Sequence, residues 1–231
     1  MLINWNHLPE ELQTEDVRTY YDLLKKRRGS LLIKRIFDVV VSLIMIILLS
    51  PVLALLALWI KMDSEGPVFY RQVRVTTGGK VFRIFKFRTM VVNADKIGAL
   101  ITAESDPRIT KVGSKLRKCR LDELPQLFNI FIGEMSFVGT RPEVKKYVDE
   151  YTDEMNATLL LPAGVTSLAS VCYKDEDEIM AEYTAKGIST DEAYVKHVLP
   201  DKMKYNLEYL RKFSFWGDIG LMIKTVISVL K

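Results

Sequence analysis

The stretch of sequence that decides the fold is Val39 to Ile60, VVVSLIMIILLSPVLALLALWI, which contains no charged residue. A run of about 20 apolar residues is long enough to cross a bilayer as a helix. It is too uniformly apolar for a surface helix, which keeps one polar face. It also begins too far from the N-terminus to be a cleaved signal peptide. We therefore expect a membrane-embedded helix.

Ser50-Pro51 interrupts this run in its middle. Proline removes a backbone donor and clashes with the preceding turn, which kinks or breaks a helix. Basic residues cluster before the run, between Lys25 and Arg35, and after it, between Lys61 and Arg83. Cationic flanks stay on the cytoplasmic side of a membrane. The alternatives are a single kinked span and a re-entrant helix-break-helix, and the charge on both flanks favours the re-entrant form.

The composition narrows the class of protein. At 231 residues the chain has the length of one domain with appendages, and its net charge of +4 is modest. That charge suits an anionic lipid surface, so we expect membrane lipids and no nucleic acid as partners. Cys119 and Cys172 lack the spacing of a metal site, and His7 and His197 are isolated. We expect free thiols in a reducing compartment and no Ser-His catalysis.

Two alternating segments follow the apolar run. Val68 to Val75 and Lys80 to Phe87 are rich in Val, Phe and Tyr and flank Gly78-Gly79, which predicts a β-hairpin. Four cations are spaced along it: Arg71, Arg74, Lys86 and Arg88. They form either a solvated strand face or a basic wall for a phosphorylated ligand.

The segment richest in candidate functional residues surrounds Asp122 and Glu123, two adjacent carboxylates among basic residues. Adjacent residues of a helix point about 100° apart, so the two side chains cannot share one role. One could be a nucleophile or metal ligand and the other an acid, a base or a second ligand. The alternative is an ordinary helix start, which favours acidic residues. Gly139 to Glu143 predicts a tight turn that presents Arg141, whose planar fork suits phosphate.

Several segments, in this order over residues 31–231, resemble one family. They are KRIFD (34–38), the run broken by Ser-Pro, GPVFYRQVRV (66–75), FRIFKFRTM (82–90), LRKCRLDELPQLFNIFIGEMSFVGTRPE (116–143) and YNLEYLRKFSFWGDIGLMIKTV (205–226). The chain resembles the bacterial sugar transferases, monotopic phosphoglycosyl transferases that act on polyprenyl phosphate, in their small form with a catalytic domain only. The ordered set is far more specific than any single motif.

The resemblance implies a two-step transfer. Asp122 attacks the β-phosphate of a UDP-sugar, releases UMP and forms a covalent aspartyl phosphosugar, which polyprenyl (undecaprenyl) phosphate then attacks. It implies Mg²⁺ as cofactor, with Asp122 and Glu123 as ligands, and leaves Glu123 as a metal partner or proton-transfer group. Arg117 and Arg141 match the positions where the family places phosphate contacts, and Lys86 and Arg88 of the hairpin are candidates for further phosphate contacts. A homodimer is a further candidate assembly. The competing hypothesis is an inactive membrane-anchored scaffold that binds nucleotide sugar or lipid.

One segment departs from the family pattern. Pro162 to Ser167, PAGVTS, replaces the Pro-Gly-Ile-Thr-Gly that many members carry in a region linked with donor recognition. The sugar is therefore left open.

The expected fold is mainly α with a small β-hairpin, an α+β monotopic membrane protein. Residues 1–30 form a helical arm that ends at Gly29, residues 31–61 the re-entrant helix, and residues 62–231 a catalytic domain at the cytoplasmic face of the bacterial inner membrane. We expect Lys34 and Arg35 to reach headgroup phosphates or to snorkel as ordinary flanks. We also expect a helix over residues 144–161 and a connecting helix and loop over residues 91–109. Residues 219–230 predict an interfacial amphipathic helix, or alternatively a core helix.

Overall fold

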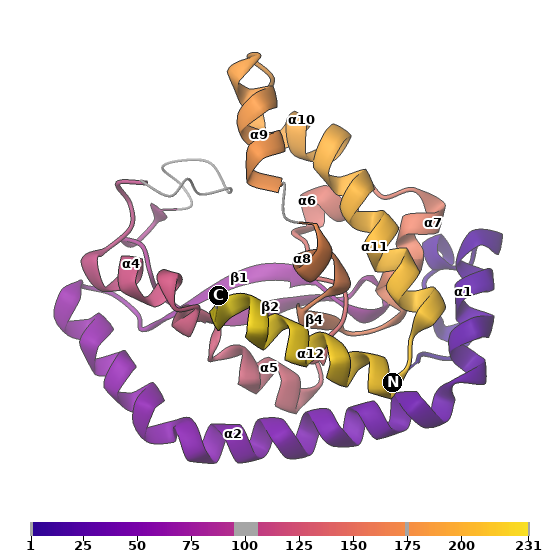
Figure 1. The fold of residues 1–231 in the computed structure, drawn as a ribbon, viewed down its shortest axis with the longest axis horizontal. Helices are drawn as coiled ribbons and strands as arrows, with labels where there is room; N and C mark the ends of the chain where they lie inside the picture. The colour runs from indigo at the N-terminus through magenta and orange to yellow at the C-terminus, as the bar shows by residue number, and fades with distance from the viewer. Residues whose placement is uncertain (1, 95–105, 174–175, 231) are drawn as a thin grey trace.

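The structure, a computed structural model, describes residues 2–94, 106–173 and 176–230. These residues are mainly helical and contain two small sheets (Figure 1). Strands β1 (Phe69–Val75) and β2 (Val81–Phe87) form the predicted antiparallel hairpin, with Phe69 opposite Phe87 and Val75 opposite Val81. Strands β3 (Met135–Val138) and β4 (Ala163–Thr166) form a parallel pair that the sequence did not predict. The mixed class dominated by helix is confirmed.

Helix α2 (Arg28–Asp63) carries the apolar run along one edge of the molecule (Figure 1). By length and composition it could cross a membrane. The predicted break is absent, because the helix continues through Ser50 and Pro51 and instead changes direction toward α4 in Figure 1. The Ser50 hydroxyl donates to the carbonyl oxygen of Ile47 at 2.8 Å, which gives that carbonyl a partner close to the proline. A proline inside a helix is a common cause of such a bend.

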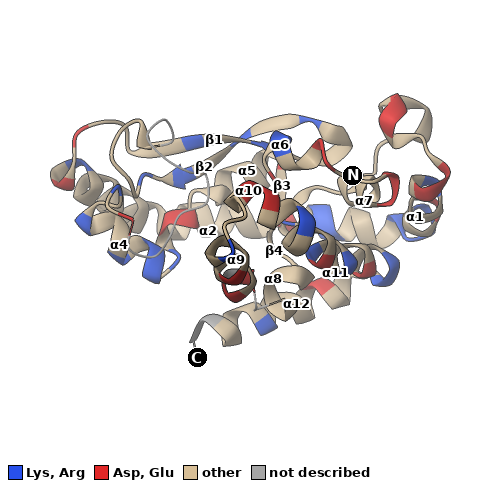
Figure 2. Cartoon of the chain, turned by 90° about the horizontal axis from the view of Figure 1, so that it is seen from above, with Lys and Arg blue, Asp and Glu red and all other residues tan. Residues whose placement is uncertain are grey.

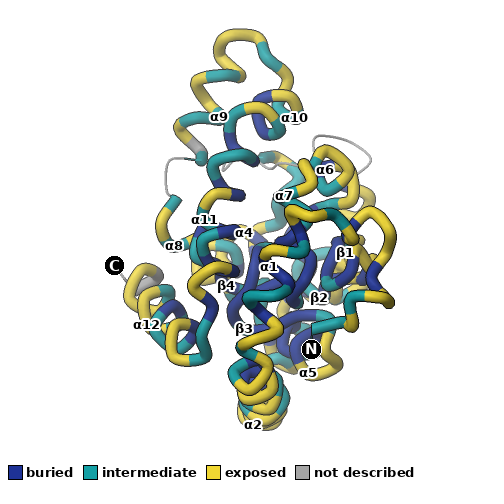
Figure 3. Tube along the Cα trace, turned by 90° about the vertical axis from the view of Figure 1, so that its right-hand side faces the viewer, coloured by how far each residue is buried: buried dark blue, intermediate teal, exposed yellow. Residues whose placement is uncertain are grey.

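The two faces of α2 differ sharply. Its buried side chains are Leu31, Lys34, Asp38, Ser42, Leu56 and Ile60. The opposite face exposes large apolar side chains: Leu32, Ile33, Ile36, Val40, Leu43, Ile44, Ile47, Leu48, Val52, Leu55, Leu58 and Met62. In Figure 3 most of the outer surface of this helix is coloured as exposed. Met45 and Leu49 pack near β2 and α5, and Leu56 and Ile60 pack against Phe87, so both halves contact the same body.

The N-terminal arm packs against that body. It comprises η1 (Trp5–His7), η2 (Glu10–Leu12) and α1 (Glu15–Lys26), which Thr14 caps by accepting from the Val17 amide. The predicted stop at Gly29 is wrong, because α1 ends at Lys26 and α2 already begins at Arg28. Arg27 holds this turn, since its guanidinium donates to the carbonyl oxygens of Arg211 and Phe213.

Lys34 and Arg35 point into the protein, so the prediction that they reach headgroups or snorkel is wrong. Lys34 Nζ lies 2.5 Å from Asp218 Oδ2 and donates to the Val138 carbonyl oxygen at 2.7 Å. Arg35 donates to the carbonyl oxygens of Ile130 and Phe131, in the last turn of α5. These groups are fixed inward because a helix C-terminus and a buried carboxylate both attract cations.

The remaining elements surround the two sheets. They are η3 (Thr77–Gly79), α4 (Lys111–Lys118), η4 (Leu121–Glu123), α5 (Gln126–Ile132), α6 (Lys145–Val148), α7 (Asp153–Asn156), η5 (Ala157–Leu160), α8 (Leu168–Cys172), α9 (Glu176–Ala185), α10 (Thr190–Ala193), η6 (Tyr194–Val198), α11 (Leu199–Lys212) and α12 (Phe215–Leu230). The helix predicted over residues 144–161 is thus three short helices. The connection predicted over residues 91–109 falls largely outside the described residues.

Helix α12 is packed on one face only, so it is not the fully buried core helix that was the alternative, and its position in a membrane interface stays a prediction. Asp218 and Leu221 are buried against the body, while Trp216, Ile223 and Val226 are exposed. Phe215 contacts Phe37 of α2, with ring centroids 5.6 Å apart, so the two helices lie together. Exposed apolar side chains on both α2 and α12 mark this region as a site of interaction with a membrane or with another protein.

Candidate active site

A tight change of direction places the two adjacent carboxylates. Helix α4 ends at Lys118, and Arg120 then adopts a left-handed conformation with φ of 55°, which turns the chain into η4. A left-handed residue other than glycine is uncommon and is often found at functional sites. Asp122 and Glu123 therefore lie in a short 3₁₀ turn ahead of α5, next to β2. Figure 2 shows Lys and Arg on α4 and β2, two elements that contact this turn.

Glu123 joins three segments that are distant in sequence. Its Oε1 atom lies 2.9 Å from Lys86 Nζ of β2 and 3.4 Å from Arg141 Nη2, in the turn after β3. The side chains of Glu123 and Lys86 are 13% and 20% exposed, whereas Arg141 is 38% exposed. The structure thus brings together three of the residues predicted for the site and leaves them open on one side.

The same surroundings affect the two carboxylates in opposite directions. Burial raises the pKa of Asp122, and the negative charge of Glu123 raises it further, against the influence of Lys86 and Arg117. Burial also acts to raise the pKa of Glu123, but Lys86 and Arg141 outweigh it and lower that pKa to about 2. Carboxylates whose pKa values are separated by their environments commonly have different roles in one reaction. Glu123 is the anion that holds two cations, and Asp122 is the more basic carboxylate.

Arg117 lies on the Asp122 side of the site. Its Nε atom donates to the Thr89 hydroxyl at 2.9 Å, and its charge acts to lower the pKa of Asp122. Arg88 is placed elsewhere. It is 5% exposed, and its terminal nitrogens donate to the carbonyl oxygens of Ser64 and Glu65 at the end of α2. Of the four predicted phosphate contacts, only Lys86, Arg117 and Arg141 surround the carboxylates.

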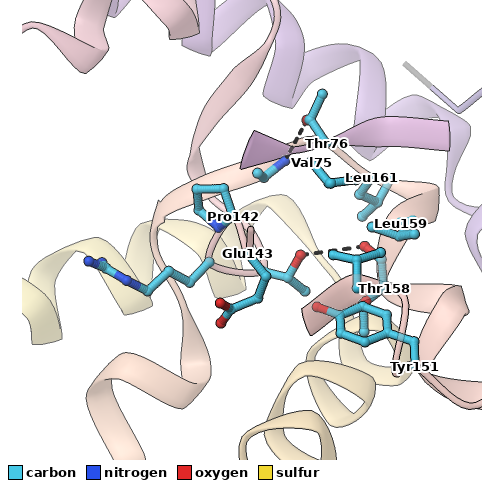
Figure 4. A pocket seen from close by; sticks show the side chains of 12 residues that line it. Val75, Thr76, Pro142, Glu143, Tyr151, Thr158, Leu159 and Leu161 are labelled. Atoms are coloured by element: carbon cyan, nitrogen blue, oxygen red, sulfur yellow. Dashed lines mark hydrogen bonds between the residues drawn. The ribbon is translucent and has the colours of Figure 1, made fainter. Parts of the chain in front are cut away.

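A pocket opens beside Glu123. It is lined by Arg74, Ile84, Lys86, Glu123, Gln126, Arg141, Pro142 and Gly164. A second pocket shares Arg141 and Pro142 and extends toward Glu143, Tyr151 and Thr158 (Figure 4). Cations outnumber acids in the first pocket, so it suits an anionic ligand.

Glu143 supports the Arg141 turn from behind. One carboxylate oxygen accepts from the Tyr194 hydroxyl at 2.7 Å and lies 3.6 Å from Lys202 Nζ, while the other lies 3.9 Å from Arg74 Nη1. These partners come from η6, α11 and β1. Sequence analysis missed this group, although Glu143 is the last residue of the GTRPE turn that it had singled out.

Two glycines let β3 and β4 approach closely enough to support that turn. The Gly164 amide donates to the Thr140 carbonyl oxygen at 2.8 Å, and the Gly139 amide donates to that of Thr166 at 3.0 Å. A Cβ atom on Gly164 would lie 2.1 Å from the Gly139 nitrogen. The segment that departs from the family pattern therefore keeps the glycine that this contact requires.

The predicted magnesium site would depend on the acidic pair. Among residues 2–94, 106–173 and 176–230, no three His, Cys, Asp or Glu side chains are grouped to form a complete metal site. Mg²⁺ is usually held by one or two carboxylates, with water and substrate phosphates completing its shell. Asp122 and Glu123 are the two carboxylates predicted for this role, and magnesium binding stays a prediction.

Known proteins match the chain over most of its length. The family model described as bacterial sugar transferase covers residues 29–231. An Aeromonas hydrophila protein named UDP-N-acetylgalactosamine-undecaprenyl-phosphate N-acetylgalactosaminephosphotransferase is 34% identical over 97% of this chain and 52% of its own length. Proteins named UDP-glucose:undecaprenyl-phosphate glucose-1-phosphate transferase are 34% identical in Escherichia coli, over 84% of this chain and 39% of that protein, and in Caulobacter vibrioides, over 85% and 69%.

The Aeromonas hydrophila and Escherichia coli relatives are longer proteins, and the chain spans about half of their length or less. Relatives named for different sugars show the same identity to this chain. Overall similarity therefore does not select the sugar.

Proposed function

The chain belongs to the bacterial sugar transferase family, and we propose that it transfers a sugar-1-phosphate from a UDP-sugar to undecaprenyl phosphate and releases UMP. This would be the first membrane step in the assembly of a glycan. The observation that carries the proposal is the asymmetry of the acidic pair, in which burial raises the pKa of Asp122 while Lys86 and Arg141 hold Glu123 ionised. The names of the relatives support the substrate classes.

In the first step, an oxygen of the Asp122 carboxylate forms a bond to the β-phosphorus of the donor. The bond from that phosphorus to the bridging oxygen breaks, and its electron pair leaves with UMP. In the second step, a phosphate oxygen of the lipid bonds to the phosphorus, and the aspartyl bond breaks to restore the carboxylate. Splitting one transfer into two displacements is the advantage of a covalent nucleophile.

The other residues bind and orient. Glu123 fixes the positions of Lys86 and Arg141, which then face the phosphoryl oxygens with their charge already in place. Arg117, fixed by Thr89, is proposed to contact the donor from the Asp122 side. Bound Mg²⁺, held by Asp122 and Glu123, would neutralise charge on the diphosphate. The inactive-scaffold hypothesis gains no support, because both carboxylates and three of the proposed phosphate contacts lie at one site.

We further propose that the protein is monotopic, at the cytoplasmic face of the bacterial inner membrane. A helix of this length extends about 54 Å, well beyond the roughly 30 Å of a hydrocarbon core. One face of α2 packs against the body from Leu31 to Ile60, and a simple span would carry its middle away from that body. An α2 that enters and leaves by one face keeps these contacts and holds the site at headgroup depth.

The reaction is tested by the nucleotide that it releases. Purified protein receives Mg²⁺, undecaprenyl phosphate and a panel of UDP-sugars, with Asp122→Asn in parallel. We expect UMP from the wild type with at least one donor and none from the variant. Release of UDP would mean transfer of the sugar alone and would refute the proposal. Binding without any turnover would favour the scaffold.

The topology is tested in intact cells by labelling single cysteines at two exposed positions, Lys26 and Glu65, on either side of α2. Cys119 and Cys172 are exposed and must first be replaced by serine. We expect both positions to be protected from an impermeant reagent added outside. Labelling of one position alone would establish a span.

A further inference from the structure

Gln126 lies in the pocket beside the acidic pair and has no role in the mechanism so far. It is the first residue of α5, three positions after Glu123, so the two side chains lie on one face of consecutive helical turns. It is 3% exposed and lines the pocket with Lys86, Glu123 and Arg141.

The carboxamide of Gln126 makes no hydrogen bond to another residue in the described part of the chain. Some polar side-chain atoms in that part of the chain are fully enclosed and have no partner, for example Arg88 Nε and Asn206 Oδ1. The polar atoms of Gln126 are not among them, so they keep some exposed surface. Gln126 is almost wholly buried, yet its polar atoms are neither bonded nor enclosed, and the pocket that the residue lines accounts for their remaining exposure. Leaving a buried amide unbonded is costly, so this arrangement favours a ligand.

Asn129, three residues further along α5, shows what a structural amide looks like. It is completely buried, and its Oδ1 accepts from the Phe85 amide at 2.8 Å. Its Nδ2 donates to the Arg83 carbonyl oxygen at 3.1 Å and to Glu134 Oε2 at 2.6 Å. Asn129 joins α5 to β2 and has no hydrogen-bonding capacity directed at a ligand. The two amides on one helix therefore form a matched pair.

The charges around Gln126 select the ligand. Lys86 and Arg141 line the pocket and share a single oxygen of Glu123. Arg74, which lies 3.9 Å from Glu143, adds a third cation, so three cations face two carboxylates. An excess of fixed positive charge favours an anion, and an amide N–H is a good donor to a phosphoryl oxygen. A sugar hydroxyl would be less favoured here than a charged oxygen.

We infer that Gln126 binds substrate by donating its side-chain N–H to a non-bridging phosphoryl oxygen, a contact that the family resemblance did not assign. The identity of the substrate rests on the proposed function. The anion site itself is argued only from the residues that line the pocket. The phosphoryl group belongs either to the nucleotide sugar or to the lipid acceptor, and kinetics with each substrate in turn separates the two.

The test compares Gln126→Met, Gln126→Glu and Asn129→Ala with the wild type. Dissociation constants for inorganic pyrophosphate with Mg²⁺ are measured first, because they need no turnover. A hydrogen bond to a charged group implies a loss of about tenfold or more in Gln126→Met. Gln126→Glu should lose more, since it keeps the volume but adds a negative charge. Asn129→Ala should lower the melting temperature and leave the affinity of the folded protein unchanged.

Steady-state kinetics completes the test. A raised KM for the UDP-sugar in the Gln126 variants would assign the contact to the donor, and a raised KM for undecaprenyl phosphate would assign it to the acceptor. Wild-type pyrophosphate affinity in both Gln126 variants, or no pyrophosphate binding by the wild type, would overturn the inference and leave Asp122 chemistry intact. Conversely, weakened pyrophosphate binding in a protein that releases no UMP from any donor would overturn the proposed function and leave the anion site standing.

Discussion

Two clusters of charged side chains in this molecule, one closed and one open, contain the same residue types but serve different purposes. The closed cluster consists of Lys34, Asp38, Tyr209 and Asp218. Lys34 and Asp218 are 7% and 5% exposed and lie 2.5 Å apart, and Asp218 also accepts from the Tyr209 hydroxyl at 3.0 Å. Asp38 accepts from the Phe137 amide. The cluster joins α2, β3, α11 and α12.

The open cluster consists of Lys86, Arg117, Asp122, Glu123 and Arg141. Two of its cations share one oxygen of Glu123, and Arg141 remains partly exposed. Its hydrogen bonds join the short turn η4 to β2 and to the turn after β3, and the short helix α4 to Thr89, rather than long packed helices. The difference teaches that fully enclosed charges serve the fold alone, whereas partly exposed charges beside a pocket can stabilise the fold and still be available for chemistry.

The largest effect should come from Asp122→Asn in the open cluster. We expect turnover to fall by at least about 10⁴-fold, as is common when a nucleophile is removed. The melting temperature should not fall, because burial disfavours the ionised form that the substitution eliminates. UMP release and thermal unfolding of the same preparation measure both quantities. A variant that keeps activity, or that loses it by unfolding, would break the distinction between the clusters.

Lys34→Met in the closed cluster should lower the free energy of unfolding by about 3–5 kcal/mol, because it leaves a buried carboxylate without its cation. The double variant Lys34→Met with Asp218→Asn should recover part of that loss. Denaturant unfolding in detergent gives the values. If the single and double variants were equally unstable, Asp218 would not be the partner that matters.

Glu123→Gln should change how stability depends on pH. The pKa of Glu123 is lowered to about 2 from its ordinary value near 4.5, so its contribution is present above pH 4.5 and is lost as the pH falls toward 2. Complete loss corresponds to about 3 kcal/mol. Unfolding at a series of pH values should show a smaller acid loss in the variant than in the wild type. Parallel profiles would show that Lys86 and Arg141 do not hold this carboxylate.

The smallest effect should come from Lys186→Ala, which removes an exposed ion pair with Glu182 at 2.5 Å. Exposed pairs within one helix contribute little, because water and salt screen them. Turnover and melting temperature should match the wild type within error. A measurable loss of activity would give α9 a part in the reaction that neither cluster accounts for.

Local patterns were sufficient to predict part of this molecule. Strict alternation around Gly78-Gly79 predicted the hairpin, and the uniform apolar run predicted α2. The acidic pair and the GTRPE turn were singled out from the sequence as candidate site segments, and in the structure Glu123 lies 3.4 Å from Arg141. These features could be predicted because each is encoded in one continuous stretch of the sequence.

Other features depend on partners that are distant in the sequence. Strands β3 and β4 have four residues each, which is too short for an alternating pattern to be recognised. In the sequence Lys34 resembles a residue that flanks a membrane helix, but in the structure it pairs with Asp218. Arg88 resembles a phosphate ligand, but it donates to the carbonyl oxygens of Ser64 and Glu65. Sequence indicates that a cation is present, but only the fold shows what neutralises it.

The central claim is that the open cluster transfers a phosphosugar through Asp122. Its most direct test is the mass of the protein after incubation with Mg²⁺ and the UDP-sugar that supports turnover, with no lipid acceptor present. We predict UMP release of at most one equivalent and a protein heavier by one sugar-phosphate, with the added mass on the peptide that contains Asp122. Repeated turnover without acceptor, or an adduct on any other residue, would contradict the account.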